Sequence, residues 1–175
     1  MFSTTIPLLG FAAYSGTGKT TLLKQLIPLL RDADLRLGVI KHAHHQVEVD
    51  RPGKASYELR KAGAGRVLLA TSRHWALMVD EPREREPELP QLLERLDCRE
   101  LDLVLVEGFR HLAFPKIELH RPALGKPLIF PEDPSVIALA SDAAIDRQTD
   151  LPRLDLNDPS VIARFILEYC AGFSP

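Results

Sequence analysis

The chain has 175 residues, of which 45% are hydrophobic and 26% charged, and its formal charge is -2 at pH 7. This length predicts one domain, residues 1–175, that can bury a core without disulfides or metals. The near-neutral charge argues against nucleic acid as the main partner. Cys98 and Cys170 have no metal-binding spacing, which indicates reduced thiols inside a cell.

The N-terminus shows no export signal. Residues 1–5 lack a basic segment, and the apolar run after them leads directly into a glycine-rich stretch that signal-peptide cleavage would destroy. No apolar run approaches the length of a membrane span. We therefore expect a soluble cytoplasmic protein.

Residues 13–20, AYSGTGKT, predict a phosphate-binding loop. An apolar run typical of a buried strand (residues 6–13) precedes them, and a segment with apolar residues at helical spacing (residues 20–30) follows. Gly16 and Gly18 allow backbone N–H groups to turn toward phosphates, while Lys19 supplies a cation. The candidate nucleotide ligands are Ser15, Gly16, Thr17, Gly18, Lys19, Thr20 and Thr21.

The first and last residues of this loop, Ala13 and Thr20, each have a specific interpretation. The usual pattern opens with glycine, and Ala13 stands there instead, a residue small enough to be a tolerated variant. The Thr20 hydroxyl is the expected loop ligand of Mg²⁺. The alternative interpretation is a glycine-rich turn that binds nothing.

A second apolar run, residues 35–40, predicts a strand that ends in the sequence KHAHH, residues 41–45. In open α/β sheets, ligands bind outside the carboxyl ends of the strands. His42, His44 and His45 could therefore form a zinc site, but His44 and His45 are adjacent and no fourth ligand has a recognisable spacing. Solvated or nucleotide-facing histidines are the favoured interpretation.

The next segment is polar and contains Pro52 and Gly53. Its Asp50 is a candidate Mg²⁺ ligand, directly or through water, or else belongs to a surface turn. A short helix (56–62), two strands that form a hairpin (67–70 and 75–79), a charged connection (80–90) and an amphipathic helix (89–96) are expected to follow.

Residues 101–107 form a continuous apolar run that predicts a central parallel strand. The strand ends in Glu107, where a carboxylate can bind Mg²⁺ opposite the Thr of the loop; the alternative is an exposed acid at a strand end. Gly108 is expected to let the backbone pass close to the phosphates, and Asp102 is expected to be structural.

The C-terminal part predicts two more strands and a helix. Residues 116–120 alternate and predict a strand with one polar face, a proline-rich loop (122–134) follows, and 136–140 predict the last buried strand. Asp142 comes after that strand, and its carboxylate can accept hydrogen bonds from the N1–H and N2 amine of guanine. Asp155 is expected in a turn, before a final helix (160–171) capped by Asn157 or Asp158.

Together these elements predict an α/β fold of the P-loop NTPase type, with a mostly parallel central sheet, helices on both faces, and a β-hairpin or extra strands. Four blocks in order, residues 11–22, 41–45, 50–64 and 102–110, also resemble the molybdopterin-guanine dinucleotide biosynthesis protein B (MobB) family. The resemblance extends over nearly the whole chain, and the joint occurrence of the blocks makes it specific.

The resemblance implies a GTP-binding P-loop protein, usually a homodimer, with at most weak Mg²⁺-dependent GTP hydrolysis. It also implies that the protein assists a MobA-type guanylyltransferase, which joins GMP to molybdopterin, and contacts molybdopterin-bearing proteins. Tyr14 does not match the Lys that relatives with a deviant loop carry at this position.

The residues themselves leave two functional classes open. One is a GTP-binding adapter, and the other is a small-molecule kinase or ligase-type enzyme that uses Glu107 and Asp50 for Mg²⁺. No Gln or Arg is identifiable as a water-positioning or finger residue, so a fast GTPase is not supported and the catalytic residues are unknown.

Overall fold

The computed structural model describes residues 4–43 and 50–174. Its backbone contacts divide the chain into two compact units, one made of Met1–His42 and Glu88–Pro175 and the other of Ala43–Pro87. Each unit is described by itself. This division into two units does not test the expectation of a single domain, which stays a prediction.

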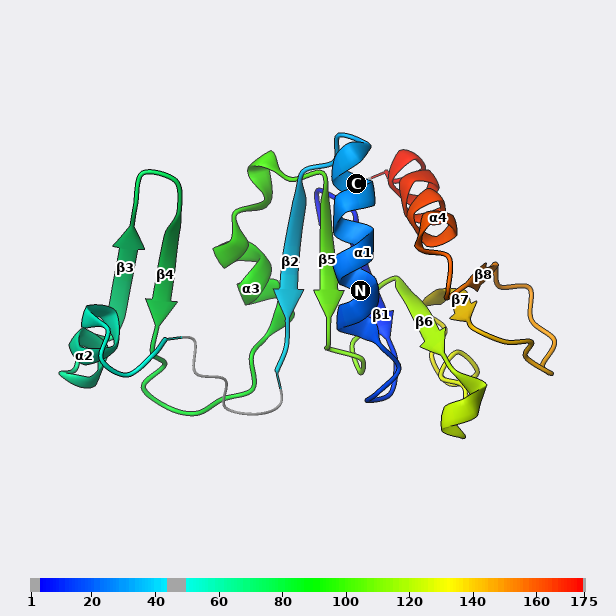
Figure 1. Ribbon diagram of the computed structural model, residues 1–175, viewed down its shortest axis with the longest axis horizontal. Helices are drawn as coiled ribbons and strands as arrows, with labels where there is room; N and C mark the ends of the chain where they lie inside the picture. The colour runs from blue at the N-terminus through cyan, green and yellow to red at the C-terminus, as the bar shows by residue number, and fades with distance from the viewer. Residues whose placement is uncertain (1–3, 44–49, 175) are drawn as a thin grey trace. The chain divides into compact units, whose positions relative to one another are not determined.

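The first unit is built on a six-stranded sheet with the strand order β2-β5-β1-β6-β7-β8. Every neighbouring pair is parallel, so the carboxyl ends of all strands lie at one edge (Figure 1). The strands are β1 (Leu8–Ala12), β2 (Leu37–Lys41), β5 (Leu103–Glu107), β6 (Lys116–His120), β7 (Val136–Ser141) and β8 (Arg153–Asp155). The predicted parallel α/β sheet is confirmed.

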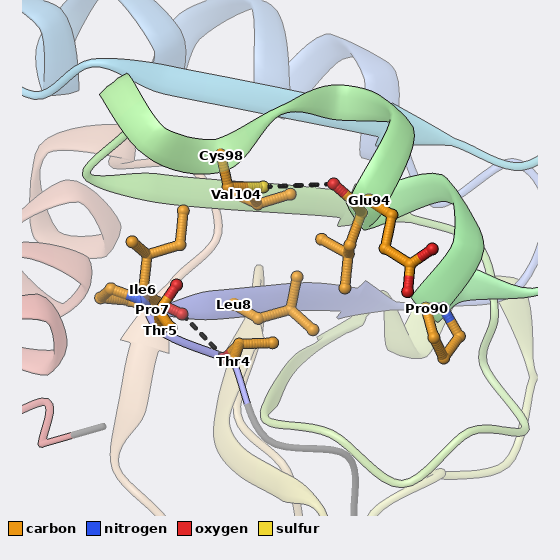
Figure 2. Close-up of a pocket in the computed structure, with 10 residues that line it drawn as sticks. Thr4, Thr5, Ile6, Pro7, Leu8, Pro90, Glu94, Cys98 and Val104 are labelled. Atoms are coloured by element: carbon orange, nitrogen blue, oxygen red, sulfur yellow. Dashed lines mark hydrogen bonds between the residues drawn. The ribbon is translucent and has the colours of Figure 1, made fainter.

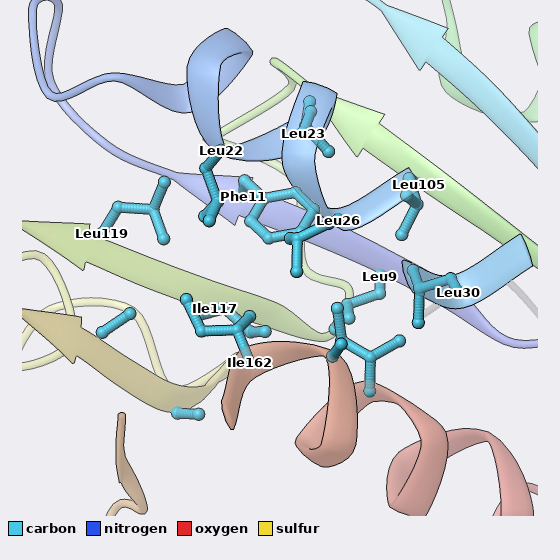
Figure 3. Packing of buried hydrophobic residues seen from close by; sticks show 14 of the residues in the cluster. Leu9, Phe11, Leu22, Leu23, Leu26, Leu30, Leu105, Ile117, Leu119 and Ile162 are labelled. Carbon is cyan, nitrogen blue, oxygen red and sulfur yellow. The ribbon is translucent and has the colours of Figure 1, made fainter. Parts of the chain in front are cut away.

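Helices cover both faces of this sheet. Side chains alternate along each strand, so that Leu9 belongs to one apolar cluster and Leu8 to another. The first cluster packs against α1 (Lys19–Asp32) and α4 (Pro159–Ala171), as Figure 3 shows, and the second packs against α3 (Leu89–Leu96). Each fully buried leucine contributes about 2 kcal/mol to folding. This packing holds the carboxyl edge of the sheet in place.

The pairing register brings three parts of the carboxyl edge together. β1 pairs with β5 at Phe11 and Glu107, and β2 pairs with β5 at Lys41 and Glu107. The backbone amide of His42 donates to the carbonyl oxygen of Glu107 at 2.7 Å and continues this pairing by one residue. Glu107 therefore lies between the end of β2 and the strand that leads into the glycine-rich loop.

The predicted strand at residues 116–120 is confirmed as β6, and its polar side chains are buried like its apolar ones. Lys116 and Glu118 are each 1% exposed. Lys116 Nζ lies 2.9 Å from Asp133 Oδ2, and the Glu118 carboxylate accepts from the amides of Ile129 and Phe130, each at 2.8 Å. The proline-rich segment supplies all these partners, which the alternation of residue types within β6 could not reveal.

Burial has a cost at Glu118 that its hydrogen bonds offset in part. Desolvation raises the pKa of this carboxyl, while the two backbone N–H groups act in the opposite direction. The segment after β6 is therefore anchored to the sheet through buried polar contacts. It begins with a short 3-10 helix, Pro122–Leu124.

The end of the chain contains one strand that the sequence analysis missed. Asp155 was expected in a turn but is the last residue of β8, a three-residue strand that pairs with β7 at the sheet edge. Such a short edge strand leaves no periodic pattern. The predicted cap of the final helix is confirmed, because Asp158 Oδ1 accepts from the backbone amide of Ser160 at 3.0 Å.

The second unit consists of α2 (Ala55–Lys61) and an antiparallel hairpin of β3 (Arg66–Ala70) and β4 (Trp75–Val79). Thr71 closes the turn, since its backbone amide donates to the carbonyl oxygen of His74 at 2.7 Å. The predicted hairpin is confirmed. Several of its apolar side chains are exposed, including Leu68 at 62% and Trp75 at 72%. In the described part of the chain, no helix has the length and apolar character needed to span a membrane.

Candidate nucleotide-binding site

The loop between β1 and α1 has the backbone conformation that phosphate binding requires. Gly16 and Gly18 have φ angles of 84° and 100°, in the left-handed region that glycine adopts without strain. The Thr17 side chain is buried, and its hydroxyl donates to the Tyr14 carbonyl oxygen at 2.9 Å. Because α1 begins at Lys19, the free amides of its first turn add favourable potential for an anion.

A cavity of about 340 Å³ lies over this loop. It is lined by Ser15, Gly16, Gly18, Lys19, Thr20, Thr21 and Glu107. Every one of these residues belongs to the predicted site, whereas Thr17, also predicted, is buried and holds the turn from within. The structure thus brings the loop and the acid of β5 to one cavity, although they are far apart in the sequence.

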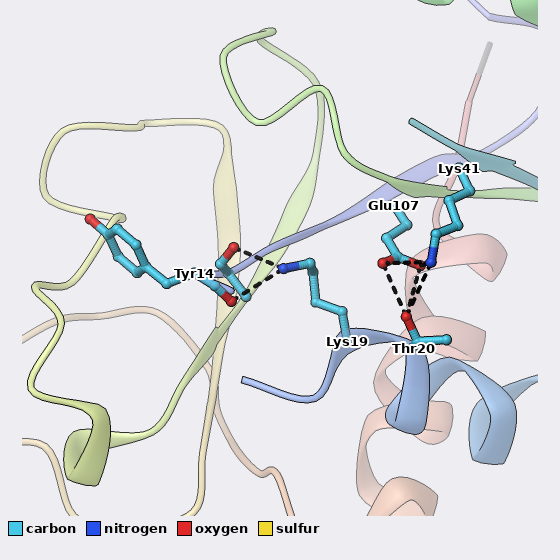
Figure 4. A network of polar contacts seen from close by, with 6 residues as sticks. Tyr14, Lys19, Thr20, Lys41 and Glu107 are labelled. Atoms are coloured by element: carbon cyan, nitrogen blue, oxygen red, sulfur yellow. Dashed lines mark hydrogen bonds and ion pairs between the residues drawn. The ribbon is translucent and has the colours of Figure 1, made fainter. Parts of the chain in front are cut away.

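Lys19 extends along the loop rather than into solvent. Its ammonium donates to the carbonyl oxygens of Ala13 at 3.0 Å and Tyr14 at 3.3 Å (Figure 4). Burial lowers the pKa of Lys19, and the nearby cations Arg110 and Lys41 act in the same direction while Glu107 opposes them. Three cations and one carboxylate therefore share this space, an excess of positive charge that suits a polyanion.

Thr20 and Glu107 form the predicted metal side of the site. The Thr20 hydroxyl lies 3.2 Å from Glu107 Oε1 and 3.4 Å from Oε2. Glu107 is only 9% exposed, so the alternative of an exposed acid at a strand end does not describe it. A hydroxyl and a carboxylate side by side are the hard oxygen donors that Mg²⁺ prefers. The residues present thus fit a magnesium ion.

Lys41 is a member of the site that the sequence analysis missed. Its Nζ lies 3.3 Å from Thr20 Oγ1 and 3.2 Å from Glu107 Oε2, as the dashed lines in Figure 4 show. Lys41 is the last residue of β2 and is paired with Glu107 in the sheet register. Its position at the end of a strand could have indicated a site residue, but the prediction for this segment concerned only the histidines that follow it.

The turn after β5 directs a second missed cation, Arg110, toward the loop. Its guanidinium lies 5.1 Å from the centroid of the Tyr14 ring.

Phe109 adopts a positive φ of 52° and stacks on the His42 ring with a centroid distance of 4.5 Å. A Cβ on Gly108 would come within 2.5 Å of His42 Cβ. His42 therefore requires glycine here, and the expected closeness of Gly108 to the phosphates stays a prediction.

Asp142 lies on the other side of the loop, where the sequence analysis placed a base-reading carboxylate. Its Oδ2 lies 2.6 Å from Arg121 Nη1, and Arg121 Nε donates to the carbonyl oxygen of Thr17 at 2.9 Å. Arg121 was not predicted, because nothing in the sequence marks this residue between β6 and the proline-rich segment. Asp142 is thus joined to the phosphate loop through one side chain, and its role toward a base stays a prediction.

The remaining candidates belong to other parts of the chain. Asp50 belongs to the second unit, where hydrogen bonds from Ser56 and from the Arg51 amide lower the pKa of its carboxyl. Its metal role stays a prediction. His44 and His45 fall outside the described residues. Within residues 4–43 and 50–174, no group of three or more His, Cys, Asp or Glu side chains could hold a metal ion.

Two further cavities in the first unit have different characters. One of about 280 Å³ lies between the start of β1 and α3, with apolar walls that include Ile6, Leu8 and Cys98 (Figure 2). It is at the amino end of β1, opposite the glycine-rich loop. The other cavity, of about 480 Å³, is polar, and Tyr14 and Arg110 beside that loop are among the residues that line it. Only the latter adjoins the candidate phosphate site.

Comparison with known proteins places these features in a family context. Residues 8–142 match the family model described as molybdopterin guanine dinucleotide synthesis protein B, MobB. The molybdopterin-guanine dinucleotide biosynthesis adapter protein of Escherichia coli (strain K12) is 51% identical over 167 residues, which cover 95% of this chain and 94% of that protein. The protein of the same name from Haemophilus influenzae is 45% identical and covers 96% and 92%.

Solved structures agree on the fold. The crystal structure of Bacillus subtilis MobB superimposes with a TM-score of 0.74 at 23% identity, covering 96% of this chain and all 100% of that one. A MobB homologue from Bacillus stearothermophilus gives a TM-score of 0.70 at 20% identity, with coverages of 95% and 99%. At these identities the likeness concerns the architecture, and it supports the α/β assignment.

Proposed function

This chain belongs to the MobB family, and we propose that it acts as a GTP-binding adapter in molybdenum cofactor biosynthesis. The family model covers most of the chain, and two relatives of 51% and 45% identity, matched over nearly their whole length, are named as adapter proteins of molybdopterin-guanine dinucleotide biosynthesis. In this role the protein would hold GTP while a partner enzyme attaches GMP to molybdopterin.

The partner in this proposal is a MobA-type guanylyltransferase, with molybdopterin-bearing proteins as further candidates. The adapter would work in the cytoplasm as a homodimer. These assignments rest on family membership and on the adapter role in the relatives' names. The residues of the site support the nucleotide part of the proposal independently.

The observation that carries the nucleotide assignment is the pairing of Thr20 with Glu107. These residues are 87 positions apart and meet at 3.2 Å, directly beside a glycine-rich loop whose amides could bind an anion. In our proposal the loop amides and Lys19 hold the phosphates, and Thr20 with Glu107 holds Mg²⁺, with Asp50 as a further candidate ligand. When bound, the metal would neutralise phosphate charge.

Hydrolysis by this site should be slow. None of the seven residues that line the cavity over the loop is a glutamine that could orient an attacking water. Arg110 is held over the Tyr14 ring and is not among those seven residues, so no arginine lines the cavity as a finger residue would. The site is therefore suited to holding a nucleotide, and its turnover is expected to be low.

A titration of GTP, ATP and GDP, each with and without Mg²⁺, tests the proposal. We expect GTP to bind more tightly than ATP, and Mg²⁺ to strengthen the binding of the triphosphate. Isothermal titration calorimetry on the full chain measures both effects. Failure to bind any of the three nucleotides would refute the proposal.

A small-molecule kinase is the second candidate, and one observation favours it. The polar cavity of about 480 Å³, which Tyr14 and Arg110 help to line, adjoins the phosphate loop and could hold an acceptor. Turnover separates the two functions: phosphorylation of a small acceptor at ordinary enzymatic rates would exclude the adapter role, and tight binding with slow hydrolysis would exclude the kinase.

A further inference from the structure

The metal side of the site already contains a cation that belongs to the protein. Lys41 Nζ contacts both groups assigned to Mg²⁺, Thr20 Oγ1 at 3.3 Å and Glu107 Oε2 at 3.2 Å. Its third short contact is to Glu107 Oε1, also at 3.3 Å. One ammonium thus engages the same hydroxyl and carboxylate that a metal ion would use (Figure 4).

We propose that Lys41 competes with Mg²⁺ for Thr20 and Glu107, so that binding of the metal–nucleotide complex requires the lysine side chain to move away. This inference rests on the proposed nucleotide function and adds a regulatory element to the same site. It makes Lys41 a positioning residue that sets how much Mg²⁺ the protein needs.

Electrostatics disfavours both cations on the same hydroxyl and carboxylate. Mg²⁺ binds its oxygen ligands at about 2.0–2.1 Å, well inside the distance at which the ammonium lies from the same oxygens. A unit charge and a double charge this close repel strongly at any protein dielectric constant. The lysine must therefore leave the two oxygens before the metal can use them.

The structure allows the side chain of Lys41 to move while its backbone stays fixed. The register of β2 with β5 and the hydrogen bond from the His42 amide to Glu107 hold the strand end. The Lys41 side chain is 53% exposed, whereas that of Glu107 is 11% exposed. The flexible partner in the ion pair is thus the lysine, which can turn into water at a small cost.

The size of the effect follows from the exposure of the pair. Ion pairs with one solvated partner contribute little, so removing Lys41 should change the apparent affinity for Mg²⁺ by about two- to fivefold. The direction is distinctive: loss of a positive charge at a competitor raises the affinity for the metal. A lysine that served only as a phosphate ligand would have the opposite effect.

The test compares the Mg²⁺ concentration needed for half-maximal GTP binding in the unmodified protein and in Lys41→Met, which keeps the length of the side chain. Lys41→Arg retains the positive charge beside Glu107 and should not lower the value. Lys24→Met removes an equal charge from an exposed position one turn beyond Thr20 and should also leave the value near that of the unmodified protein.

We expect Lys41→Met to lower the half-maximal Mg²⁺ concentration by about two- to fivefold. An unchanged or higher value would overturn the inference. The same titration with inorganic tripolyphosphate needs no base recognition, so it separates the two proposals. Binding of tripolyphosphate without binding of GTP would refute the proposed function alone, and absence of both would remove the metal–phosphate site together with the inference.

Discussion

The two sides of the phosphate loop each contain one acid and one cation, but the two pairs are anchored differently. On the metal side, Lys41 meets Glu107 through a side chain that is 53% exposed. On the base side, Arg121 and Asp142 are 33% and 22% exposed, and Arg121 also donates to the loop carbonyl of Thr17. The first pair contacts the loop only through the Thr20 hydroxyl and can exchange its cation, whereas the second is bonded to a backbone carbonyl of the loop.

This difference separates a binding device from a supporting one. Arg121 bridges a carboxylate and a backbone carbonyl, and this fixes the geometry of the loop because the planar guanidinium loses little freedom per hydrogen bond formed. The predicted contact of Asp142 with a base would have to form while its carboxylate also holds Arg121. We therefore expect changes on the metal side to alter the dependence of binding on Mg²⁺. We expect changes on the base side to alter the conformation of the loop.

The largest expected effect comes from Lys19, the cation of the loop itself. Lys19→Ala should reduce the affinity for GTP by about 100-fold, because it removes a charge-assisted contact to the phosphates. Calorimetric titration measures the loss, and circular dichroism shows that the fold is retained. Affinity within a few-fold of the unmodified protein would mean that the loop does not bind phosphate.

Glu107→Gln should break the metal side selectively. The amide keeps the volume of the side chain but loses the charge that attracts Mg²⁺, so affinity for GTP with Mg²⁺ should fall by about tenfold or more. Affinity without Mg²⁺ should fall less, since Lys41 then loses its partner and becomes available to the phosphates. Equal losses under the two conditions would assign Glu107 a structural role.

The sequence predicted the elements that depend on local patterns. Helical spacing of Leu22, Leu26 and Leu30 predicted α1, and the continuous apolar run before Glu107 predicted β5. The site residues on these elements were predicted for the same reason, because the carboxyl ends of parallel strands share one edge of the sheet. Motif and topology together were sufficient to join Thr20 with Glu107.

The missed residues depend on contacts that no local pattern contains. Lys41, Arg110 and Arg121 are ordinary surface cations in the sequence, and only the pairing of β2 with β5 and the turn after β5 show what they contact. The burial of Lys116 and Glu118 depends likewise on a segment that follows β6. Charge partners distant in sequence are the part of a site that the sequence does not determine.

The base side can be tested by separating loop support from base selection. Arg121→Ala should weaken GTP and inorganic tripolyphosphate alike, by about three- to tenfold, because the loop carbonyl loses its donor. Arg36→Ala removes a comparable arginine from a pair at the opposite edge of the sheet and should leave both affinities unchanged. A loss confined to GTP would place Arg121 at the base instead.

Asp142→Asn tests the base itself. The amide can still accept from Arg121, but it offers the guanine N1–H and N2 amine a weaker acceptor than the carboxylate. We expect the preference for GTP over ATP to fall by about three- to fivefold, with tripolyphosphate affinity nearly unchanged. Competition titration measures the ratio, and an unaltered preference would remove Asp142 from the base site.

The smallest effect is expected at Asp102, which precedes β5 and thus lies at the opposite end of the strand from Glu107. Its carboxylate accepts from the Arg36 amide at 2.8 Å and from the guanidinium at 2.9 and 2.8 Å, and these bonds lower its pKa from 3.8 to about 2. A depressed pKa in the folded state stabilises the protein above pH 4, and this contribution is lost as the pH falls from about 4 to 2.

Because the Arg36 side chain is 60% exposed, screening limits the contribution to about 0.5–1 kcal/mol. Asp102→Asn should therefore lower the urea midpoint slightly at pH 7 and leave it unchanged near pH 2, with GTP affinity unaltered at pH 7. A loss of GTP affinity equal to that of Glu107→Gln would show that the two ends of β5 are not independent, and the distinction between a binding edge and a structural edge of this sheet would then fail.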